Sequence, residues 1–85
     1  MSDDLYSFKV ITRQDFAQFV GLLLKDFTDN PSSWENRTLA DFLEALSRYT
    51  EDVQSYYDNT GKNKNADKPD WSIFADIFLG AKVYE

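Results

Sequence analysis

Apolar residues recur every three or four positions in three stretches of the chain, which is the spacing of amphipathic helices. The first stretch begins after Thr12, which has an acid three residues on, at Asp15, in the manner of a capping box. It is expected to end at Asn30, because the residue before Pro31 is pushed out of helical geometry. Its apolar stripe consists of Phe16, Phe19, Val20, Leu23 and Phe27.

The second stretch has the longest and most regular pattern, and Thr38 is its expected N-cap, again with an acid (Asp41) three residues later. Acidic and other charged residues, including Glu44 and Asp52, occupy the opposite face. The apolar side of this helix is predicted to carry Leu39, Phe42, Leu43, Leu46, Tyr49, Val53 and Tyr57.

The third stretch, expected after an Asp70 cap and over residues 71–83, is apolar nearly all round. Such a helix should be buried on more than one side. The favoured interpretation places it in the groove between the other two helices. The alternative leaves Ile73, Ile77 and Tyr84 exposed as a second apolar face that meets another protein or a second copy.

Two segments lack a clear helical pattern. Residues 1–11 are interpreted as a short extended arm laid across the helices, because no second strand is present to pair with them. Residues 58–70 contain almost no apolar residue and carry Gly, Asn and Pro, so they are predicted to form a mobile polar loop. The expected fold is therefore all-α: a single domain over residues 1–85, built as a compact bundle of three main helices.

The composition argues against most enzymatic chemistry. The chain has no Cys and no His, which excludes thiolate sites and removes the commonest general base and metal ligand. The carboxylates of the helices are expected on solvated faces, where nothing perturbs them. We therefore expect no catalytic residues, no metal site and no cofactor.

Charge and hydropathy indicate where such a protein would act. Fifteen acidic and nine basic residues give a net charge of −6, which repels nucleic acid and anionic membranes but not a basic protein. Lys62, Lys64 and Lys68 sit beside Tyr56 and Tyr57, yet acids interrupt this short cluster, and a solvated loop is the favoured interpretation. No apolar run or basic N-terminal region suggests a membrane span or a signal peptide, so a cytoplasmic location is expected.

The turn between the first two helices contains Trp34, Glu35 and Asn36. In the favoured interpretation Trp34 plugs the end of the bundle, while Glu35 and Asn36 bond the free amides at the start of the second helix. Alternatively Trp34 is a partly exposed anchor for a partner. Tyr56, at the edge of the apolar stripe, poses the same choice and is a candidate contact.

The order of these motifs resembles a family of small, uncharacterised bacterial proteins, a domain of unknown function with a WEN…FLEA…YE signature. The similarity spans about residues 12–85, and the chain departs from the pattern at Tyr49, where a Trp is expected. The resemblance implies a bacterial cytoplasmic protein and no activity. The matching positions are Trp34, Glu35, Asn36, Leu39, Phe42, Leu43, Glu44, Ala45, Asp52, Tyr56, Tyr57, Asn59, Trp71, Phe74, Ala75, Ala81, Tyr84 and Glu85.

Together these observations favour a non-enzymatic, acidic protein-interaction module that regulates or neutralises a partner, as immunity-type proteins do. A structural homodimer through the third helix is the alternative, and a carboxylate metal-binding protein or enzyme is a weaker one. The predicted contact residues are Trp34, Glu35, Asn36, Glu44, Asp52, Tyr56, Ile73, Ile77 and Tyr84.

Overall fold

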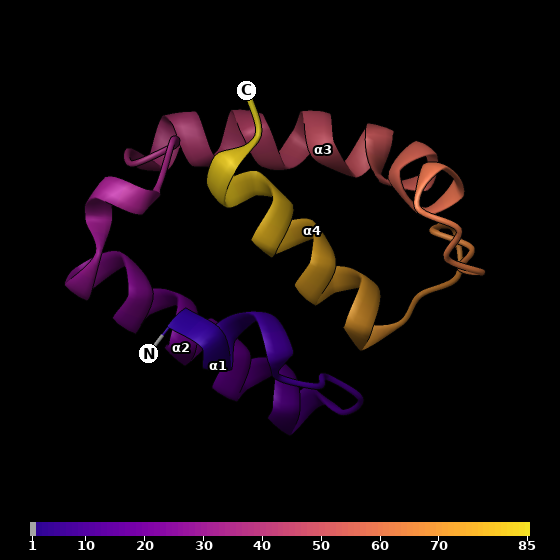
Figure 1. Ribbon diagram of the computed structural model, residues 1–85, viewed down its shortest axis with the longest axis horizontal. Helices are drawn as coiled ribbons and strands as arrows, with labels where there is room; N and C mark the ends of the chain where they lie inside the picture. Colours follow the sequence, from indigo (N-terminus) through magenta and orange to yellow (C-terminus); the bar gives the residue numbers. More distant parts are fainter. Residues whose placement is uncertain (1) are drawn as a thin grey trace.

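The computed structural model describes residues 2–85, and their side chains from Leu5 onward. The elements follow in the order α1 (Ser2–Ser7), α2 (Arg13–Asp29), a 3-10 turn η1 (Pro31–Ser33), α3 (Leu39–Asn59) and α4 (Trp71–Val83). Helix α4 lies between α2 and α3 and packs on both, most extensively on α3 (Figure 1). The all-α bundle with three main helices is thus confirmed.

Helix α2 begins and ends where its sequence signals place the boundaries. The Thr12 hydroxyl accepts the Asp15 N–H at 3.1 Å, and the Asp15 carboxylate accepts the Thr12 N–H at 3.2 Å. This reciprocal capping box satisfies donors that the first helical turn leaves free. At the other end Asn30 donates its N–H to Asp26 O at 2.8 Å, and Pro31 opens the 3-10 turn.

Helix α3 is capped at both ends by its own sequence. The Thr38 hydroxyl accepts the Asp41 N–H at 3.0 Å. After the helix, Gly61 has a φ of +73°, the left-handed region that favours glycine. The N–H of Lys62 then reaches Tyr57 O at 2.9 Å, the hydrogen bond of a Schellman motif that turns the chain towards α4.

The core forms two adjoining clusters on either side of α4. One contains Phe19, Leu23 and Trp34 with aromatic rings from α2, α3 and α4. The other contains Val53, Tyr57 and the 4 % exposed Ile73. The favoured placement of α4 in the groove between its neighbours is confirmed, because both of its sides are covered.

The N-terminal segment differs from the extended arm that the sequence suggested. Residues 2–7 form helix α1, which packs on α2, and only residues 8–11 lack regular structure. Leu5 and Val10 are both buried in the core. A six-residue helix is marginal in isolation, so packing against α2, rather than local propensity, stabilises it here.

The polar connection between α3 and α4 is shorter than predicted, because α3 continues to Asn59. It is also held at one point. Gln54 of α3 donates to Lys64 O at 3.0 Å and accepts the Ala66 N–H at 2.7 Å. Its mobility remains a prediction.

Candidate functional site

A buried ion pair joins the end of α4 to α2. Lys82 Nζ lies 2.9 Å from Asp26 Oδ2, and these two side chains are 3 % and 5 % exposed. Trp34 Nε1 donates to the same carboxylate oxygen at 2.8 Å, and Lys82 Nζ donates to the Tyr6 hydroxyl at 2.8 Å. Each buried charge therefore has more than one partner, as buried charges require.

The two charges of this pair stabilise each other. Burial alone would raise the pKa of Asp26, but the hydrogen bonds from Lys82 and Trp34 outweigh burial and hold that pKa below its usual value. Burial would likewise lower the pKa of Lys82, but hydrogen bonds with Tyr6 and Asp26 raise it instead. Both groups are charged at neutral pH, which suits a structural ion pair and not a proton donor or acceptor.

Glu35 and Asn36 complete this region by capping the last turn of α4. The backbone N–H groups of Glu35 and Asn36 donate to Lys82 O at 3.1 and 3.3 Å. The Asn36 side chain donates to Ala81 O at 2.9 Å and to Tyr84 O at 2.7 Å. The expectation that they bond amides at the start of the second helix is wrong. They bind the carbonyl groups that the end of another helix leaves free.

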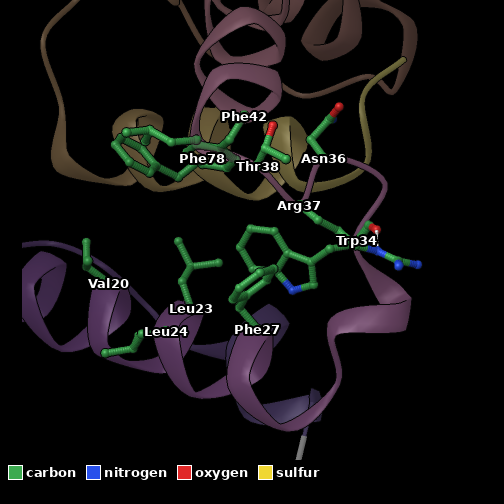
Figure 2. Close-up of a pocket in the computed structure, with 11 residues that line it drawn as sticks. Val20, Leu23, Leu24, Phe27, Trp34, Asn36, Arg37, Thr38, Phe42 and Phe78 are labelled. Carbon is green, nitrogen blue, oxygen red and sulfur yellow. Dashed lines mark hydrogen bonds between the residues drawn. The ribbon is translucent and has the colours of Figure 1, made fainter.

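An open apolar groove lies between α2 and α3, on the other side of the Trp34 ring. Its volume is about 270 Å³, and its wall residues face one another across it in Figure 2. The Trp34 ring closes one end and packs edge-on against Phe27 at 5.2 Å between centroids. The lining consists of Val20, Leu23, Leu24, Phe27, Trp34, Asn36, Arg37, Thr38, Leu39, Phe42 and Phe78.

The rim of this groove exposes large apolar side chains. Leu24 of α2 is 67 % exposed and Leu39 of α3 is 74 % exposed. Leu43, one helical turn beyond Leu39, is also exposed. The floor is closed by Phe42 and Phe78, which lie 6.0 Å apart between centroids. Single exposed leucines are ordinary, but a set gathered around one hollow is typical of a binding surface.

A protein-family model matches most of the chain, and the match begins after α1. The model of a family of unknown function, DUF7660, matches residues 12–85. The chain belongs to the DUF7660 family. The resemblance to an uncharacterised family is therefore confirmed, and the matched region contains α2, α3, α4 and the whole groove, while α1 lies outside it.

No curated protein and no solved structure matches the chain. The residues that the structure describes contain no helix long and apolar enough to cross a membrane. Within the same residues, no three acidic side chains gather in a way that could hold a metal ion.

Several predicted contact residues of this DUF7660 chain lie inside the bundle. Trp34 is 7 % exposed, so its structural interpretation holds and the partly exposed anchor is wrong. The exposed second face of the last helix is also wrong, because Ile73 packs on Val53 and Tyr57, and Ile77 is partly buried against the same cluster. That face covers α3 and is not free for a partner.

Tyr84 and Asp52 meet each other. The Tyr84 hydroxyl donates to the Asp52 carboxylate, which raises the pKa of Tyr84. The Tyr84 ring also packs edge-on against Tyr49 at 5.1 Å between centroids. Tyr84 is half-buried by these contacts, whereas Asp52 stays exposed. These two contacts hold Tyr84, which follows α4, against α3.

The predicted contact residues that remain exposed are Glu35, Glu44, Tyr56 and Asp52, the last of which also bonds Tyr84. Tyr56 is 44 % exposed and its ring lies beside Tyr49. The groove and the ion pair were missed altogether. Signals for both were present: Leu22, Leu23 and Leu24 are consecutive, so they cannot all face the core, and Lys82 is a lone cation in an apolar helix.

Proposed function

We propose that this DUF7660 protein is a non-enzymatic interaction module whose groove between α2 and α3 receives a basic amphipathic helix of another protein. The class of function is the one that the sequence favoured. The contact surface moves from the last helix, which the bundle covers, to the apolar groove.

The exposure of Leu24 and Leu39 supports this proposal most strongly. Two leucines that are 67 % and 74 % exposed border a hollow whose floor is aromatic. The described contacts of the fold do not explain why these two side chains stay in water. Burying each of them fully would contribute about 1.5–3 kcal/mol of favourable free energy. An amphipathic helix that lays its apolar face in such a groove would remove both from solvent.

The arrangement of the helices favours a helical occupant. Helices α2 and α3 each pack on α4, which lies between them, and make little contact with each other (Figure 1). Val20 and Leu24, one turn apart, line the α2 wall, and Leu39 lines the α3 wall, with the exposed Leu43 one turn further along that helix. A partner helix with apolar residues at positions i, i+3, i+4 and i+7 has the matching spacing.

The charge of the protein favours a partner helix of opposite charge. Helix α3, whose residues Leu39 and Phe42 line the groove, contains five acidic residues and one basic residue, Arg48. Arg37, which precedes this helix, is a basic residue of the lining itself. The whole chain carries a net charge of −6, so a second copy would be repelled. A helix with Lys or Arg beside its apolar stripe would instead be attracted. The acidic residues of α3 are Asp41, Glu44, Glu51, Asp52 and Asp58, of which Asp41 and Glu44 are the nearest in sequence to the lining residues.

The absence of enzymatic activity is part of the proposal and rests on the missing His and Cys. It is further supported by the buried ionisable groups, Asp26 and Lys82, which are committed to each other. No observation favours the homodimer through α4, because that helix is sandwiched between α2 and α3. A cytoplasmic location and a bacterial origin remain expectations.

A peptide titration tests the proposal. Two designed helical peptides would share one leucine stripe, and their polar faces would carry either lysines or glutamates. We expect saturable binding of the lysine peptide, followed by isothermal titration calorimetry, and at least tenfold weaker binding of the glutamate peptide. A lysine peptide of the same composition with a scrambled stripe should also bind at least tenfold more weakly, which separates groove binding from general charge attraction.

Two variants locate the contact. Leu24→Gln with Leu39→Gln should abolish binding of the lysine peptide. Val83→Gln is the matched control, because Val83 is 51 % exposed and does not line the groove. Unchanged binding in the double variant would refute the proposal. A dimer seen by sedimentation that the double variant dissolves would also refute it, by making a second copy the occupant.

A further inference from the structure

A second, more polar hollow lies between residues 6–11, α4 and the chain after α3. It has a volume of about 440 Å³ and adjoins a smaller hollow of about 210 Å³. The two share Tyr6, Lys62, Asp76 and Leu79, and neither shares a lining residue with the apolar groove. Their combined size suits a small molecule.

The charge of this hollow is opposite to that of the protein. Lys9, Lys62 and Lys64 line it, although the whole chain is strongly acidic. Asp76 also lines it, but its carboxylate already accepts the Tyr57 hydroxyl at 2.7 Å and lies 3.0 Å from Lys64 Nζ. Among the side chains that the structure describes, Lys9 and Lys62 have no carboxylate within 4.0 Å. Within the described side chains, the hollow therefore presents two lysines that are not paired with a carboxylate.

Aromatic rings border the same lysines. Tyr6, Tyr49 and Tyr56 line the smaller hollow together with Lys62. Tyr6 and Tyr56 are 60 % and 44 % exposed, so parts of their rings are open to a ligand. Tyrosine faces stack on planar heterocycles, and lysines bind phosphate oxygens through charge-assisted hydrogen bonds.

We infer that this hollow binds a mononucleotide, with the phosphate at Lys9 and Lys62 and the base against the tyrosines. The inference is independent of the proposed helix-binding groove. It assigns a role to the basic, aromatic segment whose sequence alone favoured a solvated loop. A single nucleotide is preferred over a polymer, because the net charge of −6 repels a long polyanion.

The test is a titration of the full chain with AMP, GMP, CMP and UMP, monitored by amide chemical shifts in NMR spectra. The nucleoside that corresponds to each nucleotide, and inorganic phosphate, serve as the two halves of the ligand. We expect at least one nucleotide to bind with a Kd of about 1 mM or tighter. We also expect that nucleotide to bind at least about fivefold more tightly than either half, with shifts around Lys62 and Tyr56.

A pair of lysine variants separates a built site from general charge. Lys62→Gln should weaken nucleotide binding about five- to tenfold, because it removes one charge-assisted contact. Lys68→Gln removes the same charge from the same connection but not from the lining, so it should leave the Kd unchanged. Equal effects of the two variants, or no saturable shift with any nucleotide at about 10 mM, would overturn the inference.

Discussion

Gly80 of α4 is closely packed against a neighbouring helix, whereas Gly21 of α2 has open space around it. A Cβ on Gly80 of α4 would stand 2.1 Å from Tyr49 Cε2, so α3 and α4 touch there as closely as glycine allows. A Cβ on Gly21, next to the groove residue Val20, would meet nothing within 4 Å. The interfaces that α4 makes are closed, whereas the surface between α2 and α3 is open.

This difference extends to polar groups. Where α4 meets α2, a full ion pair is buried, and no buried side-chain nitrogen or oxygen of the described residues lacks a hydrogen-bond partner. Where α2 faces α3, apolar side chains are left in water. Trp34 belongs to both regions, because its Nε1 bonds Asp26 and its ring lines the groove. We infer that the closed interfaces maintain the fold and that the open one is kept for a partner.

The largest expected effect is on the closed side, at the ion pair. Lys82→Met leaves the Asp26 carboxylate buried without its cation, so the free energy of unfolding should fall by about 3–5 kcal/mol. Urea denaturation at neutral pH measures this change. Adding Asp26→Asn removes the second charge but keeps an acceptor for Trp34 Nε1, and should recover most of the loss. A single variant that loses less than about 1 kcal/mol would mean that the pair does not stabilise the α2–α4 interface.

The pH dependence of stability should carry the signature of the same pair. The pKa of Asp26 is lowered in the folded state, so its contribution is present above the ordinary value of 3.8 and is lost as the pH falls through the folded pKa. The pKa of Lys82 is raised, so its contribution is present below 10.5 and is lost as the pH rises through the folded pKa. The Asp26→Asn/Lys82→Met variant should lack both losses in denaturation series against pH. An unchanged pH profile would contradict this assignment.

Gly80→Ala tests the closed contact between α3 and α4. The new methyl must displace the Tyr49 ring, which Tyr56 and Tyr84 hold on its other sides, so we expect a loss of about 1–3 kcal/mol in unfolding free energy. Thermal and urea denaturation both report it. In a Tyr49→Ala background the same change should cost little, because the obstructing ring is gone. A full cost in that background would locate the strain elsewhere.

Gly21→Ala is the matched change on the open side. The new methyl meets no other atom within 4 Å, and alanine favours a helix interior more than glycine does. The free energy of unfolding should therefore rise by up to about 1 kcal/mol. The comparison with Gly80→Ala uses one substitution and one denaturation assay. If Gly21→Ala were instead destabilising, a contact of α2 that the described structure does not contain would be required.

Most of the fold could be predicted from local signals. Thr12, Thr38 and Asp70 cap the helices as expected, because a cap and its partner N–H lie within three residues of each other. The packing partners could not be predicted in the same way. Ile73 and Ile77 have the pattern of a free face, and only the position of α3 shows that Val53 and Tyr57 cover it.

The candidate groove could not be predicted for the same reason: local signals do not show which elements pack together. The helical spacing predicts that Leu39 lies on the apolar side of its helix, yet Leu39 is 74 % exposed, because α2 does not close over it. Helical periodicity identifies which residues share a face, but not what that face meets. Asp26 and Lys82 lie 56 positions apart in the sequence, and no local pattern joins such a pair.

The most direct test of the open surface compares folding and binding in one variant, Leu24→Gln with Leu39→Gln. Both side chains are exposed, so the free energy of unfolding should stay within about 0.5 kcal/mol of the parent chain. Affinity for the lysine-flanked helical peptide should nevertheless fall at least tenfold in parallel calorimetry. A destabilised variant would show that the groove serves the fold, and unchanged affinity in a stable variant would show that the partner binds elsewhere.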